Sequence, residues 1–417
     1  MEAMVECCAG VDVHQGKVVV CLLSGALKGQ KVRREVRTFR TMRRELEQMA
    51  EWLQKAGCTH VGMESTGVYW MPVYAVLEGG FKLLVGNAQH IKKVPGRKTD
   101  VTDAEWIARL VRSGMMPDSY VPPAPLRALR EVLRYRRGLV EARTQERNRL
   151  LKLLETANVK LASVATDVFG VSGMLMLRAL AEGKKTPEQM AHLARGLLRK
   201  KVADLVLALE GRLQEHQRQL LSLQLERLDD TEQQIGKLEA LVDQMLQEHQ
   251  ELMQRLCTIP GVDRVVAATL IAELGVDMKY FPTERHAAAW AGVAPGNNES
   301  AGKQGPVRTR RGNVHLKTAL VEAARSASRA KGTYLRDKYH RLKARRGANR
   351  AAMAIAHKIL KAAYHLVKTP GVTYKELGES YLDECDKRRV TTNLVRRLQR
   401  LGYRVALEQQ QEERPAA

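Results

Sequence analysis

The sequence predicts an α/β N-terminal domain with a mixed sheet, followed by a helical middle segment and a mainly helical C-terminal segment. Short runs rich in β-branched residues alternate with helical patterns over the first 115 residues. The middle of the chain has no proline between Pro187 and Pro260, as long helices require. A chain of 417 residues is long enough for two or three domains of roughly 100–200 residues each. We therefore expect domains at 1–115, 116–256 and 257–417.

Five strands and two helices are expected in the first domain. The strand predictions are 7–13, 17–23, 33–39, 59–65 and 81–87. The first helix is predicted from apolar residues that share one face and precede Gly57, namely Met42, Leu46, Met49 and Leu53. The second is the apolar segment GVYWMPVYAVL, which comes before the fifth strand. Because hairpin-linked strands are followed by a crossover helix, the sheet must be mixed, and RNase H-like folds are built in this order.

The middle segment has apolar residues at heptad spacing. One seam repeats every seven residues at Leu221, Leu228, Ile235 and Val242, and a second follows three residues on at Leu238, Met245 and Leu252. This spacing is typical of a short coiled coil. A packed helical hairpin inside one subunit explains the pattern as well as an oligomer contact does. Gln224 and His249 fall at seam positions and weaken the oligomer interpretation.

The charge of the chain points to a polyanionic partner. Lys and Arg total 69 against 46 Asp and Glu, a formal net charge of +23. More than half of this excess lies in 303–350, where only Glu322 and Asp337 oppose the basic residues. Such a segment attracts nucleic acid by neutralising phosphates. Aromatic residues make up only 5% of the chain, so contacts with the backbone and with duplexes are expected rather than base stacking.

The cysteines and the apolar runs exclude several other classes of protein. The six cysteines form no CxxC pair and lack metal-ligand spacing, so we expect reduced thiols and neither a structural zinc nor a disulfide framework. No apolar run approaches the ~18 residues of a membrane span. The N-terminus MEAMVECCAG lacks the pattern of a secretory signal. The expectation is a cytoplasmic protein with no membrane partner.

Four acidic residues are candidates for a metal site. Asp12 ends the first predicted strand and Glu64 ends the fourth. Asp100 and Asp103 open a helix as an i,i+3 pair on one face, with Thr99 as the expected N-cap. If the sheet forms as predicted, the four carboxylates converge and two Mg²⁺ ions would neutralise them. Taken singly, each acid is better explained as a solvated charge, and the helical pair as N-terminal charges, so the prediction depends on the joint placement of all four.

A second candidate site lies in the Gly- and Asn-rich stretch GVAPGNNESAGKQGPVRTRRGNVHLKTAL. Ser300 lies in this stretch, and the basic residues close behind it are Lys303, Arg308, Arg310 and Arg311. A serine beside cations can attack a phosphodiester while the cations stabilise the developing charge. From composition alone, an ordinary turn is the more economical interpretation.

Two further features are weaker signals. IPGV at 259–262 resembles a helix-hairpin-helix element that grips phosphate, but Asp263 stands where a second glycine would be expected. A simple turn between helices is the alternative. His14 lies beside Asp12 and is predicted to be a supporting or surface group. The sequence contains no P-loop, HExxH or GxSxG motif.

Several motifs taken together resemble a known family. GVDVHQ, MESTGVYW, VPGRKTDVTDAEW, YRR, IPGV, WAGVAPGNNESAGK and RRGNVHLKTAL resemble, in order, the DEDD transposases of the bacterial insertion-sequence family numbered one hundred and ten. The resemblance implies a RuvC-like N-terminal domain, a coiled-coil middle, a C-terminal transposase domain and a protein of the bacterial nucleoid. It also implies a homotetrameric recombinase that excises and inserts its own element. A bridge RNA that pairs with donor and target DNA would guide it.

The resemblance also assigns roles to residues. It implies an Mg²⁺-binding tetrad of Asp12, Glu64, Asp100 and Asp103, with Ser300 as the nucleophile that forms a 5′-phosphoserine link. In the family these two parts of the site come from different subunits. Two other functions remain as alternatives. A RuvC-like junction nuclease would use metal-activated water and would not need Ser300. A non-catalytic nucleic-acid-binding protein would need only the basic segment.

Overall fold

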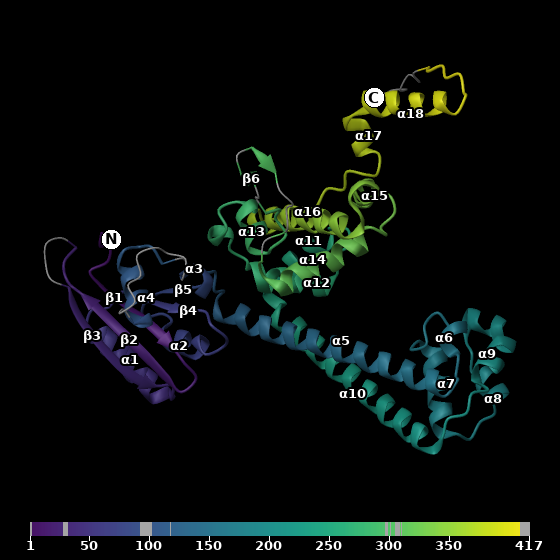
Figure 1. Ribbon diagram of the computed structural model, residues 1–417, viewed down its shortest axis with the longest axis horizontal. Helices are drawn as coiled ribbons and strands as arrows, with labels where there is room; N and C mark the ends of the chain where they lie inside the picture. Colours follow the sequence, from purple (N-terminus) through teal and green to yellow (C-terminus); the bar gives the residue numbers. More distant parts are fainter. Residues whose placement is uncertain are drawn as a thin grey trace. The chain divides into compact units, whose positions relative to one another are not determined.

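The computed structural model describes residues 2–27, 32–91, 102–116, 118–296, 299–300, 302–304, 309 and 311–408 (Figure 1). The chain forms two compact units, Met1–Val121 and Pro122–Ala417. None of the helices in these described ranges combines the length and the apolarity that a membrane span requires.

The first unit is built on a five-stranded mixed sheet. Its strands are β1 (Cys7–Val13), β2 (Lys17–Ser24), β3 (Arg33–Arg40), β4 (His60–Glu64) and β5 (Lys82–Gly86). Their order across the sheet is β3-β2-β1-β4-β5. β1 and β3 pair antiparallel with β2, whereas β4 pairs parallel with both β1 and β5. The mixed sheet predicted from the sequence is confirmed, and its order is that of an RNase H-like fold.

Helices cover both faces of this sheet. α1 (Arg43–Lys55) and α2 (Trp70–Leu77) pack on the face that carries Ala9 and Val11 of β1. α4 (Asp103–Arg112) packs on the opposite face, against Cys8. The four-residue helix α3 (Ala88–Ile91) follows β5.

The predicted face of the first helix is confirmed with one correction. Leu46, Met49 and Leu53 of α1 are buried. Met42 does not join them, because it is the extended N-cap residue before the helix and its side chain is 65% exposed.

Two long helices dominate the middle of the second unit. α5 (Ala124–Thr156) and α10 (Glu215–Met245) run side by side (Figure 1). Ion pairs join Arg136 to Glu239 and Arg143 to Glu232, so the two helices are antiparallel. The heptad residues at the contact between them are all buried: Leu221, Leu228, Ile235 and Val242. This seam is therefore covered inside one chain, as the packed-hairpin interpretation requires.

Smaller helices pack at the end of this helix pair. They are α6 (Leu161–Val164), α7 (Val171–Glu182), α8 (Pro187–Ala191), the 3-10 helix η1 (Gly196–Lys201) and α9 (Val202–Leu209). Their core includes Leu150 and Leu154 of α5 together with Leu221 and Leu225 of α10.

The C-terminal part of the second unit is mainly helical. It contains η2 (Gln247–His249), α11 (Gln250–Cys257), α12 (Arg264–Leu274), η3 (Met278–Tyr280), α13 (Glu284–Trp290), α14 (Val314–Ala327), α15 (Tyr334–Arg346), α16 (Ala348–Lys368), α17 (Tyr381–Cys385) and α18 (Lys387–Arg400). Two short strands, β6 (Glu299–Ser300) and β7 (Lys303–Gln304), form an antiparallel hairpin. α16 is the central helix of this part, because it packs on α11, α13, α14 and α15.

The turn before α12 explains the acid at position 263. Asp263 is the N-cap residue of α12, and its Oδ1 accepts a hydrogen bond of 2.8 Å from the Val266 N–H. Gly261 has φ +87°, and a Cβ there would lie 2.2 Å from the Ala323 carbonyl oxygen of α14. The turn is thus packed against another helix, as an ordinary connection between helices would be.

Candidate active site

Two of the predicted acids lie side by side at one edge of the sheet. β1 and β4 are parallel, with Gly10 opposite Gly62 and Val11 opposite Met63. The next residues along this register are Asp12 and Glu64. Neighbouring strands are about 4.8 Å apart, and every second side chain points to the same face. Both carboxylates therefore lie at the same edge of the sheet and point to the face that carries Gly10 and Gly62.

The third acid, Asp103, begins α4, a helix that starts toward this edge. The helix lies so close to the sheet that a Cβ on Gly10 would be 2.2 Å from the Ala104 carbonyl oxygen and from the Ala108 nitrogen. The Cys8 thiol reaches the Ala108 carbonyl oxygen at 3.5 Å. α4 therefore runs antiparallel to β1, and its first residue, Asp103, lies toward the end of β1 that carries Asp12.

The start of α4 differs in detail from the sequence expectation. Thr102 is the N-cap, and its Oγ1 accepts a hydrogen bond of 3.4 Å from the Glu105 N–H. Thr99, expected in this role, and Asp100, the fourth acid of the predicted tetrad, lie outside the described residues. Asp103 is exposed in the first turn of the helix.

Polar neighbours orient the two strand-end carboxylates. His14 Nε2 lies 3.1 Å from Asp12 Oδ2, and the side chain of Asp12 is 27% exposed. The Thr66 hydroxyl donates a hydrogen bond to Glu64 Oε1. His14 thus contacts Asp12, one of the predicted acids.

The donor set suits a hard divalent cation. Two carboxylates on adjacent strand ends repel each other unless a cation lies between them, and carboxylate oxygens are the ligands that Mg²⁺ prefers. Within the described ranges, no three His, Cys, Asp or Glu side chains gather closely enough to hold a metal. Asp12 and Glu64 are therefore the part of the predicted tetrad that the fold places together directly.

The predicted nucleophile belongs to the β6–β7 hairpin of the second unit. Ser300 on β6 pairs with Lys303 on β7 across a turn in which Gly302 has φ +75°. β6 stands outside the helical core, near α13 (Figure 1). For Ser300 and Lys303 only the backbone is described. Of the other basic residues predicted here, Arg311 is exposed, whereas Arg308 and Arg310 lie outside the described residues.

A buried carboxylate near the base of this hairpin was missed by sequence reasoning. Glu273 on α12 is 2% exposed and lies between two guanidinium groups of α5. Arg130 Nε lies 3.0 Å and Arg134 Nη2 lies 2.9 Å from its carboxylate oxygens. The Asn313 side-chain amide donates a third bond of 2.7 Å to Glu273 Oε2. The available signal was an acid near the end of the otherwise apolar stretch VVAATLIAEL.

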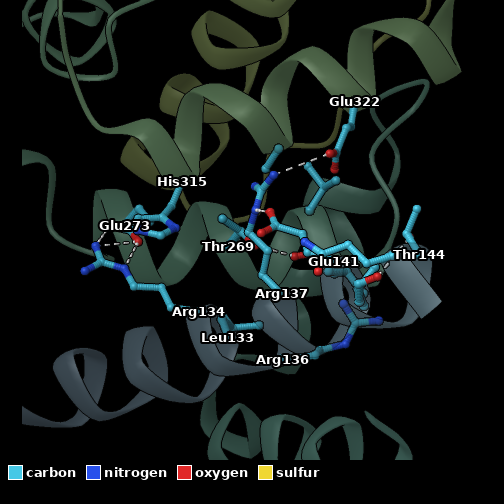
Figure 2. A pocket seen from close by; sticks show the side chains of 15 residues that line it. Leu133, Arg134, Arg136, Arg137, Glu141, Thr144, Thr269, Glu273, His315 and Glu322 are labelled. Atoms are coloured by element: carbon cyan, nitrogen blue, oxygen red, sulfur yellow. Dashed lines mark hydrogen bonds and ion pairs between the residues drawn. The ribbon is translucent and has the colours of Figure 1, made fainter. Parts of the chain in front are cut away.

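Glu273 and Arg134 border a cavity of about 510 Å³ between α5, α12 and α14. Figure 2 shows Glu273, Arg134 and His315 at one end, and Arg137 with Glu141 and Glu322 at the other. Burial, and then the positive charge of Arg134, lower the pKa of His315 below its usual value. The imidazole is therefore neutral at pH 7.

Comparison with known proteins relates both parts of the chain to transposases. Residues 9–159, which include the predicted tetrad, match a family of DEDD transposases described as "Transposase". Residues 253–340, which include Ser300, match the family described as "Transposase IS116/IS110/IS902 family". A relative named "Putative transposase y4pF/y4sB" comes from Sinorhizobium fredii (strain NBRC 101917 / NGR234). It is 25% identical to this chain over 342 residues, which cover 79% of this chain and 78% of the relative's length. The chain belongs to the IS110 family of transposases, enzymes that cleave and rejoin DNA.

Proposed function

We propose that this transposase excises and inserts its own element with an acidic metal site in its first unit and a serine nucleophile in its second. Asp12, Glu64, Asp100 and Asp103 would hold Mg²⁺, with two such ions balancing the charge of four converging carboxylates. When bound, the metal supplies electrostatic stabilisation of the charge that develops on the phosphodiester. The observation that carries this proposal is the parallel register that sets Asp12 level with Glu64 on neighbouring strands.

Ser300 is the proposed nucleophile. Its hydroxyl oxygen forms a bond to phosphorus as the bond from phosphorus to the 3′ oxygen of the strand breaks. The serine gives up its proton, and the leaving 3′ oxygen takes one up. The product is a 5′-phosphoserine ester, which keeps a phosphoester bond available for rejoining. The backbone pairing of Ser300 with Lys303 supports this role, because it makes a basic residue the neighbour of the serine in the hairpin.

Bridge RNA is the proposed guide, with donor and target DNA as its pairing partners. The chain carries a net charge of +23 and few aromatic residues, which suits contact with phosphates more than the reading of bases. The second unit exposes a set of basic residues on and around α14–α16: Arg325, Arg329, Lys331, Lys343, Arg345, Arg346 and Arg350. With sequence read by base pairing, such a surface needs only to hold the backbone of the nucleic acid.

A homotetramer is the proposed assembly, with domains at 1–115, 116–256 and 257–417. The tetrad belongs to the first unit and Ser300 to the second. If the active site is shared between subunits, DNA cleavage requires that the complex assemble first.

The test is a denaturing gel that separates a covalent protein–DNA adduct from free DNA. Purified protein, Mg²⁺, RNA from the non-coding end of the element and labelled donor DNA are combined. Ser300→Ala and Asp12→Ala are run alongside. We expect an adduct with the wild type and none with either variant, while both variants still retard the DNA in a native gel. Free nicked product that is unchanged by Ser300→Ala would instead establish the RuvC-like hydrolytic nuclease.

A further inference from the structure

We propose that Glu273 is a positioning residue for DNA cleavage. Held between Arg130 and Arg134, it fixes Asn313 and thereby the base of the hairpin that carries Ser300. This inference rests on the proposed role of Ser300 as the nucleophile. Glu273, Arg130, Arg134 and Asn313 all lie outside the hairpin itself, and each acts through the backbone that it holds.

The Glu273 carboxylate is a buried charge, and both of its oxygens have hydrogen-bonding partners. Arg134 donates to both oxygens of the carboxylate, at 2.9 and 3.1 Å. Arg130 donates to the carbonyl oxygens of Ala272 and Glu273 as well, at 2.8 and 2.7 Å. A buried carboxylate is destabilising unless it is paired and hydrogen-bonded, and these contacts offset that cost. The carboxylate is therefore a fixed point on α12.

Asn313 connects this fixed point on α12 to two other helices. Its side-chain amide donates to Glu273 Oε2 at 2.7 Å, and its Oδ1 accepts from the Leu316 N–H at 3.0 Å as the N-cap of α14. Its backbone N–H donates to the Trp290 carbonyl oxygen of α13 at 3.0 Å. One residue thus joins α12, α13 and α14 at the point where the chain returns to the helical core.

The two ends of the excursion from the helical core are in direct contact at this point. A Cβ on Gly312 would lie 2.3 Å from the Gly292 nitrogen and 2.6 Å from the Trp290 carbonyl oxygen. Only glycine fits there without moving the backbone. The leg that leaves at Gly292 and the leg that returns at Gly312 are therefore held against each other at the hairpin base.

The base of the hairpin, at Trp290 and Asn313, supports its tip, at Ser300 and Lys303. At the base, the Asn313 N–H donates a hydrogen bond to the Trp290 carbonyl oxygen. At the tip, Ser300, ten residues after Trp290, pairs with Lys303, ten residues before Asn313. An isolated antiparallel bridge between Pro295 and Thr309 lies between this base and the Ser300–Lys303 pair. A fixed base therefore fixes the points at which both legs of the hairpin leave the helical core.

The experiment breaks the bond between Asn313 and Glu273 without removing the helix cap. In Asn313→Asp, the new carboxylate still caps α14, because Asp and Asn are equally good N-caps. It faces the Glu273 carboxylate, so the 2.7 Å hydrogen bond is replaced by repulsion. We expect the rate of DNA cleavage to fall about 10- to 100-fold, as displacements near 1 Å can produce. The affinity for donor DNA should stay within about twofold of wild type, because no proposed phosphate contact is changed.

A second substitution restores the bond with donor and acceptor exchanged. When Asn313→Asp is combined with Glu273→Gln, the new glutamine amide can donate to the carboxylate introduced at position 313 while its oxygen accepts from Arg134. The double variant should therefore recover cleavage to within about threefold of wild type, which a merely structural loss would not allow. Glu322→Gln is the matched control, because Glu322 borders the same cavity but its side chain is 62% exposed and lies 3.8 Å from Arg137. It should cleave as the wild type does.

The readouts separate this inference from the proposed function. Cleavage of Asn313→Asp at the wild-type rate, or a loss that Glu273→Gln fails to restore, would overturn the positioning role. Adduct formation by the wild type and its loss in Ser300→Ala are scored on the same gel and test only the nucleophile. Hydrogen exchange at the amides of Gly292 and Asn313 should be faster in the single variant and slow again in the double variant. That result supports the positioning of the hairpin even if no adduct forms.

Discussion

The close contact between α4 and the sheet gives a direct test of the proposed metal site. In Gly10→Ala, the added Cβ would lie 2.2 Å from the Ala104 carbonyl oxygen and from the Ala108 nitrogen, whereas ordinary contact begins near 3.4 Å. Both obstacles are backbone atoms of a helix, so no side-chain rotation relieves them. The shortfall of about 1.2 Å must be met by moving α4 away from β1.

The size of the effect follows from this displacement. Forcing a methyl group into a packed contact costs about 1–3 kcal/mol, so the melting temperature of the first unit should fall by roughly 4–15 °C. Because Asp103 moves with α4 while Asp12 stays on β1, cleavage should fall about 100-fold. Calorimetry and the rate of adduct formation on labelled donor DNA measure the two effects, and DNA affinity should be unchanged.

Two other glycines of the first unit serve as controls. A Cβ on Gly62 would meet the Val111 Cγ2 atom at 2.4 Å, but a side chain can rotate away, so Gly62→Ala should lose less activity than Gly10→Ala. A Cβ on Gly16 would meet nothing within 4 Å, so Gly16→Ala should behave as the wild type. If Gly10→Ala cleaves DNA as fast as Gly16→Ala, the placement of α4 over the acids is wrong.

Two further predictions concern stability. Asp263→Ala removes the N-cap of α12 and should lower the free energy of unfolding by about 1 kcal/mol, whereas Asp263→Asn should keep it. Chemical denaturation measures both, and equal losses in the two variants would contradict the capping role. The pKa of His315 is lowered in the folded state, so its contribution to stability is present above about pH 6.5 and is lost as the pH falls through that value toward the lower folded pKa. His315→Gln should therefore flatten the fall in melting temperature between about pH 7.5 and 5.5, and an unchanged slope would refute the assignment.

Local patterns were enough to predict the sheet. The predicted strands 7–13 and 17–23 correspond to β1 and β2, because alternating β-branched residues and a short turn leave few other arrangements. The neighbouring positions of Asp12 and Glu64 followed from strand order alone. The start of α1 was placed too early, since an apolar residue just before a helix has the same spacing as one inside it, and Met42 is such a residue.

Other features depend on contacts that the sequence does not reveal. The seam of Leu221 and Leu228 has the same spacing whether α5 or another chain covers it, and only the tertiary structure shows that α5 does so. Glu273 has no charged partner nearby in sequence, because Arg134 is 139 residues away. The two residues are brought together only by the packing of α5 against α12.

The two faces of the N-terminal sheet differ in how they respond to change. On one side, Leu46, Met49 and Leu53 are flexible side chains that can repack, so this interface is compliant and absorbs volume-conserving substitutions. On the other side, Gly10 meets the backbone of α4 directly, so this interface is rigid. The spacing between Asp12 and the start of α4 is thus set by main-chain geometry. Substitutions can therefore accumulate in the core on the compliant side while the edge that carries Asp12 and Glu64 keeps its geometry.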